Sequence, residues 1–498
     1  MRENTGKVVL VGAGPGDTGL LTLKGEKYIK QADCLVYDRL SSPQLLSMAK
    51  AGCELIYVGK ENHKHVMKQD AINELLYEKS KCHELVVRLK GGDPYVFGRG
   101  GEEALYLVER NVDLEVVPGV SSSVAALAAA GIPITHRGIA KGFQVITAHS
   151  RKDEEADIDY SLLTDETITC VFLMGLAHVK SIAAGLIKAG RRADTPAAVI
   201  SNGTLAAQRK CIGTLADIGE KIEKEKLTSP AIIVVGDVVS LNDRLDFFEK
   251  RPLFGRKITV PYIETMAGTN ELISKLQQLG ADVTPVKTGI IKPIIIPDFI
   301  NKIKSADWIL FTSKNGVKSF FYNLDLAGAD IRLIANARFA VVGKATEKEL
   351  AKHHIKADLI PAEQTGKGLA EEVKFYMQDD YKLSNKKSKV CIFSAKEASP
   401  DLEAGLKGIC ELEKIDAYVN EQADESISES IGNSISEAVF TSASNVDRFF
   451  DMLPENTCVE TAYSIGEKTT DALKQHNVRN IVQSDDSSYE ALVNKISN

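Results

Sequence analysis

The sequence predicts an α/β protein whose sheets are mostly parallel. Short apolar runs alternate with helical patterns along the whole chain, a rhythm typical of strand–helix–strand units. The runs are continuously apolar rather than alternating, which indicates strands buried on both faces of a sheet. In chain order they are KVVLVG, DCLVYD, LVVRL, FQVITA, CVFLMG, AIIVVG, KITVP, WILFTS, FAVVG, KVCIFSA, EAVFTS and AYSIG.

A break near residue 250 divides the chain. With 498 residues, the chain is long enough for about three or four globular units of ordinary size. The stretch LNDRLDFFEKRPLFGRK, residues 241–257, follows the strand AIIVVG and precedes the new strand KITVP. We therefore predict a first part at 1–245, a linker at 246–252 and a second part at 253–498.

The second part contains an internal repeat. ILFTSKNGVKSFF (309–321) is similar to AVFTSASNVDRFF (438–450), and FAVVGKATEKELAKH (339–353) is similar to AYSIGEKTTDALKQH (462–476). Each segment reads as strand, polar turn and helix, in the same order. We predict two similar α/β lobes, with the acidic, Ser-rich stretch 420–437 in or beside a connection between them.

Composition and charge argue against several classes of protein. The net charge of −7 argues against general nucleic-acid binding, which needs a basic excess. No apolar run is long enough for a membrane span, and MRENTGK at the N-terminus lacks the apolar core of a secretion signal. We therefore expect a cytoplasmic protein that binds neither nucleic acid nor membrane. The eight cysteines form no C-x-x-C pair and are expected to be reduced thiols.

A metal site is not expected. His63 and His65, in NHKH, have a spacing that could ligate a metal ion, but no third ligand is apparent in this polar stretch. Structural zinc sites use four protein ligands and catalytic sites use three. We favour a solvated loop or helix face for this segment.

The first glycine loop, VGAGPGD (11–17), departs from a phosphate-binding turn. Gly12 and Gly14 fit the dinucleotide fingerprint G-x-G-x-x-G, but Asp17 stands where the third glycine belongs. Pro15 has no N–H to donate, and Asp17 adds a negative charge where a pyrophosphate would bind. The loop suits close approach to a flat or cationic ligand better than phosphate, and a tight turn without any ligand is the structural alternative.

Asp38 and four further segments bear on this choice. Asp38 ends the next strand, where a dehydrogenase has its ribose-binding acid. A dehydrogenase is therefore the alternative enzyme at this point. The four segments, however, carry more glycine turns than packing requires: VVRLKGGDPYVFGRGGEEA (86–104), VVPGVSSSVAALAAAGIPITHRG (116–138), VFLMGLAHV (171–179) and ISNGTLAAQR (200–209).

With these segments, residues 7–245 resemble uroporphyrinogen-III C-methyltransferases of the tetrapyrrole methylase class. The matching motifs, in chain order, are VGAGPGD, LVYDRL, VGK, RLKGGDPYVFGRGGEE, PGVSSS, GIPITHR, FLMG and NGT. The resemblance implies a two-lobed α/β domain and a homodimer. It implies transfer of two methyl groups from S-adenosylmethionine to uroporphyrinogen III, which gives precorrin-2 for sirohaem or cobalamin.

The resemblance also implies the residues that bind the methyl donor. They are Pro15, Gly91, Gly92, Asp93, Val96, Ser121, Ser122, Met174 and Gly203. The family often has Thr-Ala where this chain has Ser121–Ser122, and because both pairs are small we expect binding to be kept.

Catalytic and acceptor-binding residues follow from the same resemblance. Asp38 matches the family's proposed base, and Lys60 matches its proposed acid or charge stabiliser. A carboxylate beside the macrocycle can accept the proton that leaves, and no metal is required. The acceptor is a polycarboxylate, and basic side chains can bind it. The candidates are Arg88, Arg99, His136 and Arg137, with an intrachain or surface ion pair as the alternative for each.

The strand–helix turns of the second part carry Ser and Thr. They include Thr312–Ser313, Thr346, Thr441–Ser442 and Thr469–Thr470. A helix N-terminus favours anions, although capping alone explains one such turn. Four comparable turns at the edge of open α/β sheets indicate a cleft for a polycarboxylate.

Residues 253–498 resemble uroporphyrinogen-III synthases, on looser motifs: ILFTSKNGV, VVGKATEKEL, IDAYVNEQ, VFTSASNV and IGEKTTDAL. The resemblance implies two flavodoxin-like, parallel-sheet lobes, at about 253–288 plus 420–498 and about 290–418. Two strands would join them, near 286–293 and 416–421.

The synthase resemblance implies cyclisation of hydroxymethylbilane to uroporphyrinogen III, with loss of a hydroxyl group and inversion of ring D. Tyr418 matches a cleft tyrosine that can donate a hydrogen bond to the leaving hydroxyl, and Thr346 and Thr469 match other cleft positions. Ser313 and Ser442 are expected at anion-binding helix ends. A non-catalytic tetrapyrrole-binding module is the alternative for this part.

Overall fold

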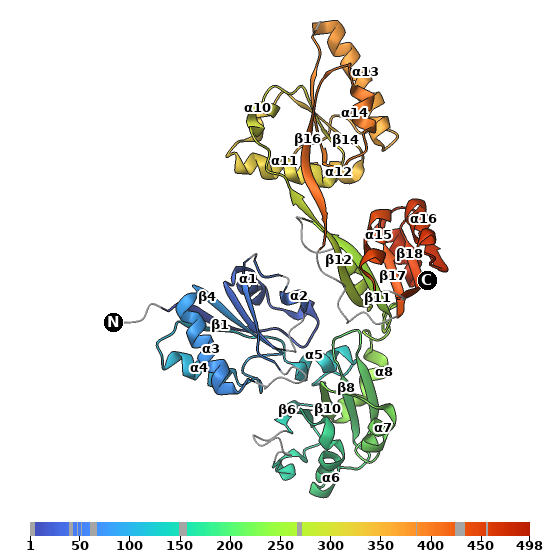
Figure 1. Cartoon of the computed structure of the whole chain (residues 1–498). Coiled ribbons are helices and arrows are strands. Elements are labelled where there is room, and N and C mark those ends of the chain that lie inside the picture. Colours follow the sequence, from blue (N-terminus) through green and yellow to red (C-terminus); the bar gives the residue numbers. More distant parts are fainter. Residues whose placement is uncertain are drawn as a thin grey trace. The chain divides into compact units, whose positions relative to one another are not determined.

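The chain divides into two α/β units (Figure 1). The first contains Met1–Arg256 and Gln277–Asp282, and the second contains Lys257–Leu276 and Val283–Asn498. The structure is a computed structural model that describes residues 5–38, 43–46, 48–50, 52–59, 67–148, 157–265, 271–384, 386–423, 434–454 and 457–498.

The first lobe of the first unit is built on a parallel sheet with the strand order β3-β2-β4-β1-β5. Its strands are β1 (Lys7–Gly12), β2 (Cys34–Tyr37), β3 (Glu54–Tyr57), β4 (Leu85–Lys90) and β5 (Leu114–Val117). Its helices are η1 (Thr18–Leu20), α1 (Leu23–Gln31), α2 (Pro43–Leu46), α3 (Gln69–Cys82) and α4 (Gly100–Val108).

Both faces of this sheet are buried, which explains the continuous apolar runs. Val8 and Leu10 of β1 pack in a cluster with residues of α3 and α4. Val9 and Val11 pack on the opposite face, in a cluster with residues of α1 and α2. Because side chains alternate along a strand, successive residues of β1 are buried on opposite faces, and the run is apolar throughout. The predicted α/β class is confirmed.

The second lobe of the first unit has a mixed sheet with the order β6-β7-β10-β8-β9. Its strands are β6 (Gly142–Thr147), β7 (Ile168–Leu173), β8 (Pro196–Ser201), β9 (Arg209–Thr214) and β10 (Ala231–Val235). Its helices are α5 (Ser122–Ala129), η2 (Tyr160–Leu163), η3 (Leu176–His178), α6 (Val179–Ala189), α7 (Ile218–Glu225), η4 (Asp237–Leu241) and α8 (Asn242–Leu245).

The prediction of mostly parallel strands is wrong for this sheet. Only β6 and β7 run parallel among its described pairs, while β10 is antiparallel to both neighbours and β8 is antiparallel to β9. The connection at 202–208 is too short for a parallel crossover, so β9 must return beside β8 in the opposite direction. An apolar run indicates burial but does not give strand direction.

The segment that follows the second lobe still packs on the first unit. Phe248 is 5% exposed and Leu253 is fully buried. The amide N–H of Leu253 donates to the carbonyl of Leu279. Residues 246–252, which we expected as a linker, contact the first unit through Asp246 and Glu249, which form ion pairs with Lys210 of β9 at 2.6 and 3.2 Å.

The second unit is built on a sheet with the order β14-β13-β15-β16-β12-β11-β17-β18-β19. Its strands are β11 (Lys257–Glu264), β12 (Asp282–Pro293), β13 (Trp308–Phe311), β14 (Arg338–Val341), β15 (Lys389–Ala395), β16 (Glu411–Gln422), β17 (Ser434–Phe440), β18 (Cys458–Ser464) and β19 (Asn480–Gln483). Its helices are α9 (Glu271–Gln278), α10 (Phe299–Ile303), α11 (Lys314–Leu326), η5 (Ile331–Ile334), α12 (Lys344–Ala351), α13 (Gly366–Ser384), α14 (Asp401–Leu406), α15 (Ala443–Met452), α16 (Glu467–Gln475) and α17 (Tyr489–Ser497).

The strands β12 and β16 pair in antiparallel fashion, from Gly289 opposite Gln422 to Pro293 opposite Tyr418. On one side of this pair the β13, β14 and β15 strands are parallel to each other, and on the other side β11, β17, β18 and β19 are parallel. Two parallel groups therefore share one sheet through an antiparallel pair.

The internal repeat is visible in matching contacts. Ser313 accepts a hydrogen bond from the N–H of Gly316 and caps α11, and Ser442 accepts from Asn445 and caps α15. At the end of each repeated segment a phenylalanine stacks on a histidine. The ring centroids are 3.6 Å apart for Phe321–His353 and 4.6 Å apart for Phe450–His476. The two halves of the second unit thus repeat one local design.

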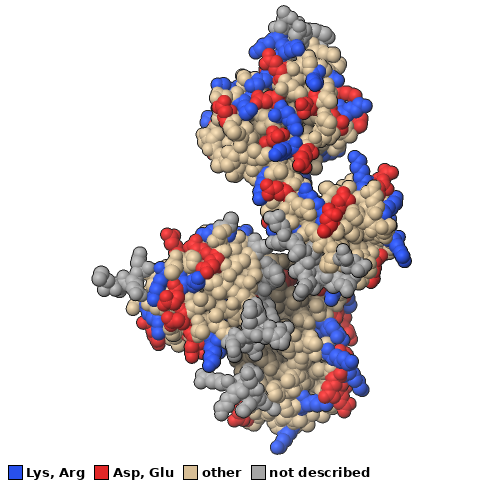
Figure 2. All heavy atoms as spheres, viewed as in Figure 1, with Lys and Arg blue, Asp and Glu red and all other residues tan. Residues whose placement is uncertain are grey.

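Charged side chains of both signs lie on the surface. Figure 2 shows Lys and Arg interspersed with Asp and Glu over the described surface of this face. All eight cysteines are free thiols. Among the described residues, none of the helices is both long enough and apolar enough to cross a bilayer.

Candidate active sites

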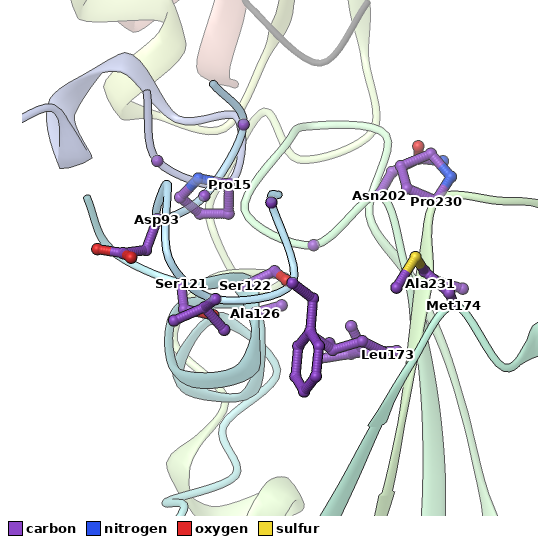
Figure 3. Close-up of a pocket in the computed structure, with 18 of the residues that line it drawn as sticks. Pro15, Asp93, Ser121, Ser122, Ala126, Leu173, Met174, Asn202, Pro230 and Ala231 are labelled. Atoms are coloured by element: carbon purple, nitrogen blue, oxygen red, sulfur yellow. The ribbon is translucent and has the colours of Figure 1, made fainter. Parts of the chain in front are cut away.

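A cavity of about 260 Å³ lies in the first unit and is lined by turns from both of its sheets. The lining residues lie at or after the ends of β1, β2, β4, β5, β7 and β8, on α5 and at the start of β10. In Figure 3, Asp93, Ser121 and Ser122 lie on one side of the cavity, and Met174, Pro230 and Ala231 lie on the other.

Glycine is required where the first turns of this cavity meet. A Cβ atom on Gly12 would lie 2.5 Å from the Cα of Gly119, so the two backbones are in direct contact. Gly14 and Gly92 exchange two backbone hydrogen bonds, of 3.2 and 2.7 Å, and have φ angles of 77° and 68°. Left-handed backbone of this kind favours glycine. The two loops therefore form one fixed edge of the cavity.

Two aspartates stabilise these turns. Asp93 accepts hydrogen bonds from the N–H groups of Gly119 (3.0 Å) and Tyr95 (2.8 Å). Asp17 accepts from the N–H of Gly19 (2.8 Å) and caps η1. The charge of Asp17, which we expected at the ligand position, instead stabilises its own turn, and Asp17 does not line the cavity.

All nine residues that the sequence suggested for the methyl donor line this one cavity. They are Pro15, Gly91, Gly92, Asp93, Val96, Ser121, Ser122, Met174 and Gly203. They come from five separate turns, and Ser121 also caps α5 by accepting from the N–H of Ser123. The fold therefore brings the nine residues together, while their role in binding stays a prediction.

Asp38 lines the same cavity and belongs to a chain of buried charges. Its carboxylate lies 3.2 Å from the guanidinium of Arg88, which in turn lies 3.5 Å from Glu103. Glu103 is fully buried and also accepts a hydrogen bond of 2.9 Å from Lys90. Burial, together with the neighbouring charge of Arg88, holds the pKa of Lys90 below its ordinary value. Two cations and two carboxylates thus share one network, in which Asp38 and Lys90 line the cavity and Arg88 and Glu103 do not.

Arg88, which we expected as a substrate contact, has intrachain partners. Its side chain is 4% exposed and donates hydrogen bonds to the carbonyls of Leu89 (2.9 Å) and Val36 (3.5 Å) in addition to its ion pairs. With its donors used inside the protein, the structure favours the intrachain alternative. Arg88 orients Asp38 rather than offering a free guanidinium to the cavity.

The other basic candidates lie at the surface. Arg99 has a φ of 57° and forms a two-point hydrogen bond with Glu102 at 2.7 and 2.9 Å. His136 and Arg137 are exposed in a turn between α5 and β6. None of these three side chains lines the cavity. Lys60 lies outside the described residues, as do His63 and His65.

Sequence reasoning missed Glu103, although a signal was present. On α4 the buried residues are Gly100, Glu103, Ala104 and Leu107, which is one face of a helix. A carboxylate on an otherwise buried face needs a partner, and the preceding strand offers Lys90. The adjacent Glu102 is half-exposed. The helical periodicity of α4 therefore distinguishes the buried Glu103 from the exposed Glu102.

One group of potential metal ligands occurs among the described residues. Side-chain atoms of Cys34, Glu54 and His83 lie within 4.8 Å of one another. Glu54 is already engaged by Lys79 (2.5 Å) and His83 (2.9 Å). Burial, mainly, raises the pKa of the Cys34 thiol to about 12. The ammonium of Lys79 and the protonated thiol both act against a metal ion there.

The second unit brings two predicted residues into contact. The hydroxyl groups of Ser313 and Tyr418 are 2.9 Å apart, and Tyr418 is 8% exposed. Thr346 is buried at the start of α12. These residues lie in the half of the unit that contains β13 to β15. Ser442 and Thr469 lie in the other half, where Thr469 is buried near the start of α16.

Known families match each part of the chain. Residues 7–219 match the family of Tetrapyrrole (Corrin/Porphyrin) Methylases. Residues 270–494 match the family Uroporphyrinogen-III synthase HemD.

Curated relatives cover one part or the whole chain. The Porphyrin biosynthesis protein HemD of Ruminiclostridium josui is 39% identical over 507 residues, which cover 99% of this chain and 97% of the relative. The S-adenosyl-L-methionine-dependent uroporphyrinogen III methyltransferase of Methanosarcina barkeri is 49% identical, over 49% of this chain and 96% of the relative. Siroheme synthase 2 of Yersinia enterocolitica is 45% identical, over 49% of this chain and 51% of the relative.

Proposed function

Because this chain belongs to the family of proteins that join a uroporphyrinogen-III C-methyltransferase to a uroporphyrinogen-III synthase, we propose that it carries out both reactions. The second part cyclises hydroxymethylbilane to uroporphyrinogen III with inversion of ring D. The first part adds two methyl groups to that product and gives precorrin-2. Both family resemblances of the sequence are confirmed, and the likeness to one relative extends over the whole chain.

The cavity of the first unit is the proposed site for S-adenosylmethionine. Its lining combines apolar side chains, which suit an adenine ring, with the glycine and serine turns, which expose backbone polar groups. Asp38 adds a carboxylate at the same wall, where a cationic ligand is favoured. The relative from Methanosarcina barkeri, whose name specifies this donor, supports the assignment. When bound, the donor supplies an activated methyl group, so we propose that no metal takes part.

Asp38 is the proposed proton acceptor. Arg88 holds its carboxylate through the 3.2 Å contact, so that the group is oriented before the acceptor binds. A carboxylate fixed in this way can accept the proton that leaves the methylated macrocycle or stabilise the developing positive charge. Lys60 is the proposed acid or charge stabiliser. Arg99, His136 and Arg137 are the proposed partners of the acceptor's carboxylates.

In the second part, Tyr418 is the proposed donor of a hydrogen bond to the leaving hydroxyl of hydroxymethylbilane. Its contact with Ser313 fixes the phenol. Ser442, Thr346 and Thr469 are the proposed contacts of the substrate's carboxylates, because they lie at or near helix N-termini, where anions are favoured. The substrate is reactive by itself, so holding its shape is the main task of this part.

Several finer assignments complete the proposal. We assign the methyltransferase to 1–245, the linker to 246–252 and the synthase to 253–498, with lobes at about 253–288 plus 420–498 and about 290–418. We further propose a cytoplasmic homodimer that supplies precorrin-2 to sirohaem or cobalamin formation. The relative named siroheme synthase supports the first of these two routes.

The single observation that carries the methyltransferase assignment is that nine residues expected from sequence line one cavity. Gly203→Ala tests it, because a Cβ there would lie 2.3 Å from the Cβ of Ala126. Calorimetry with S-adenosylhomocysteine should show clearly weaker binding. Gly101→Ala is the matched control, since a Cβ at Gly101 meets no atom within 4 Å. Equal binding by the parent chain and both variants would contradict the assignment.

A further inference from the structure

The turn after β8 brings strained backbone to the wall of the donor cavity. Asn202, Gly203 and Leu205 line the cavity, and Asn202 and Thr204 have φ angles of 50° and 73°. A positive φ is unfavourable for a β-branched residue such as threonine, and it persists only where the surroundings impose it. The contacts of Thr204 therefore show what holds this part of the cavity.

Gln208 holds Thr204 in this conformation. Its side-chain oxygen accepts a 2.9 Å hydrogen bond from the N–H of Thr204, and the two residues are 2% and 5% exposed. The hydroxyl of Thr204 in turn accepts from the N–H of Asp17, at 3.2 Å. Gln208 thus acts through Thr204 on the first glycine loop, which forms the opposite edge of the same cavity.

Gln208 is itself held by a residue from the segment that leads to the second unit. Its amide nitrogen donates to the carboxylate of Glu249 (2.9 Å) and to the carbonyl of Ala129 (3.3 Å). Lys210 fixes that segment, with contacts of 2.6 Å to Asp246 and 3.2 Å to Glu249. The side chains of Lys210, Asp246 and Glu249 are 13%, 10% and 20% exposed, so these ion pairs are largely shielded from water.

We propose that Gln208 and Glu249 are positioning residues that hold the 202–205 turn in its binding conformation, so that donor affinity in the first unit depends on the segment that precedes the second unit. The inference rests on the proposed binding of S-adenosylmethionine in this cavity. The side chain at position 208 must accept a hydrogen bond from Thr204 and donate one to Glu249 at the same time. An amide side chain can do both, because it carries an acceptor oxygen and a donor nitrogen.

Gln208→Glu tests the proposal in the full chain. The new carboxylate can still accept from Thr204, but it faces the carboxylate of Glu249 without a donor between them. We expect the dissociation constant of S-adenosylhomocysteine, measured by calorimetry, to rise about tenfold, which corresponds to about 1.4 kcal/mol. The KM for S-adenosylmethionine should rise similarly while kcat changes little, because the Asp38 network is untouched.

The reciprocal double variant distinguishes loss of this hydrogen bond from a general loss of folding. In Gln208→Glu with Glu249→Gln, the donor and acceptor exchange places, and the carboxylate at 208 accepts from both Thr204 and the new amide. Part of the lost affinity should return, because the exchange restores the contact with position 249 but leaves the carbonyl of Ala129 without its donor. Gln144→Glu, at an exposed position on β6, is the control for the added charge and should bind like the parent chain.

Two results would overturn the inference: unchanged affinity and KM in Gln208→Glu, or a double variant that binds no more tightly than the single one. Should Gln208→Glu fail to fold, the double variant still decides, since recovery of folding and affinity requires the exchanged hydrogen bond. Absence of S-adenosylhomocysteine binding by the parent chain would instead overturn the proposed function, and this inference with it.

Discussion

Replacing Glu103 by glutamine should destabilise the first unit far more than the same change at its neighbour Glu102. Glu103 is fully buried and balances Lys90 at 2.9 Å and Arg88 at 3.5 Å, both 5% exposed or less. Removing one partner of a buried ion pair costs about 3–5 kcal/mol. Glutamine keeps the shape and one hydrogen bond, so we expect about 3 kcal/mol. The Arg99–Glu102 pair is 56% and 53% exposed, and such pairs contribute about 0.5 kcal/mol.

Thermal unfolding of the full chain measures this difference. For a unit of this size, each kcal/mol shifts Tm by about 2–4 °C. Glu103→Gln should therefore lower the transition of the first unit by about 6–12 °C, and Glu102→Gln by about 1–2 °C. The transition is assigned to the first unit by its rise with S-adenosylhomocysteine, since a ligand stabilises the unit that binds it. Equal shifts for the two variants would refute the claim that Glu103 balances buried charge.

Three further outcomes are expected. Asp38→Asn should lower kcat for methyl transfer by about 100-fold or more with S-adenosylhomocysteine affinity kept, and an unchanged rate would exclude Asp38 as the base. Tyr418→Phe should slow formation of the type III isomer about tenfold, measured by separating the isomers after oxidation. Ser313→Ala should slow the same reaction less, because it removes only the hydrogen-bond partner of the Tyr418 phenol. A larger loss of rate in Ser313→Ala than in Tyr418→Phe would show that Ser313, and not Tyr418, contacts the leaving hydroxyl. Hydrogen bonds from Lys24 and other partners lower the pKa of Glu115 to about 2 from 4.5, so their stabilisation is present above pH 4.5 and is lost as the pH falls toward 2. Glu115→Gln should flatten the fall of Tm across that window, and an unchanged slope would show that other groups cause it.

The buried strands could be predicted from the sequence because a strand covered on both faces consists of consecutive apolar residues. Val8 to Val11 are apolar at every position, and both faces of β1 are covered by helices. Strand direction was harder, since β8 and β10 have the same apolar character as β1 yet run antiparallel to each other. The short connection at 202–208 reverses the chain into β9, and β10 keeps that direction, which an apolar run does not record.

The lining of the cavity could be assigned from motifs because turn residues carry a local signature. Gly92 has a left-handed φ of 68°, and a Cβ on Gly203 would lie 2.3 Å from the Cβ of Ala126; such glycines are recognisable in sequence. Gln208 and Glu249 carry no such signature. Their proposed role depends on a hydrogen bond between two residues that are 41 positions apart. From the sequence alone, each would be predicted as a polar surface residue.

Arg88 shows why the position of a residue along its strand matters. An arginine within a glycine-rich, ligand-binding segment suggests a substrate contact, but its position within β4 directs it into the protein beside Glu103. Lys90, the last residue of β4, lines the cavity, whereas Arg88 lies two residues before the strand end and is buried. The register of a side chain relative to the strand end therefore decides its role, and this register becomes clear only in the folded chain.

The most direct test of the account is a coupled assay on the full chain. Purified protein would receive hydroxymethylbilane under anaerobic conditions, with and without methyl-labelled S-adenosylmethionine, and products would be separated by mass and by isomer after oxidation. The account predicts the type III isomer without the methyl donor and a dimethylated, labelled product with it. Type I isomer alone would contradict the synthase assignment, and type III isomer without label would contradict the assignment of the cavity around Asp38.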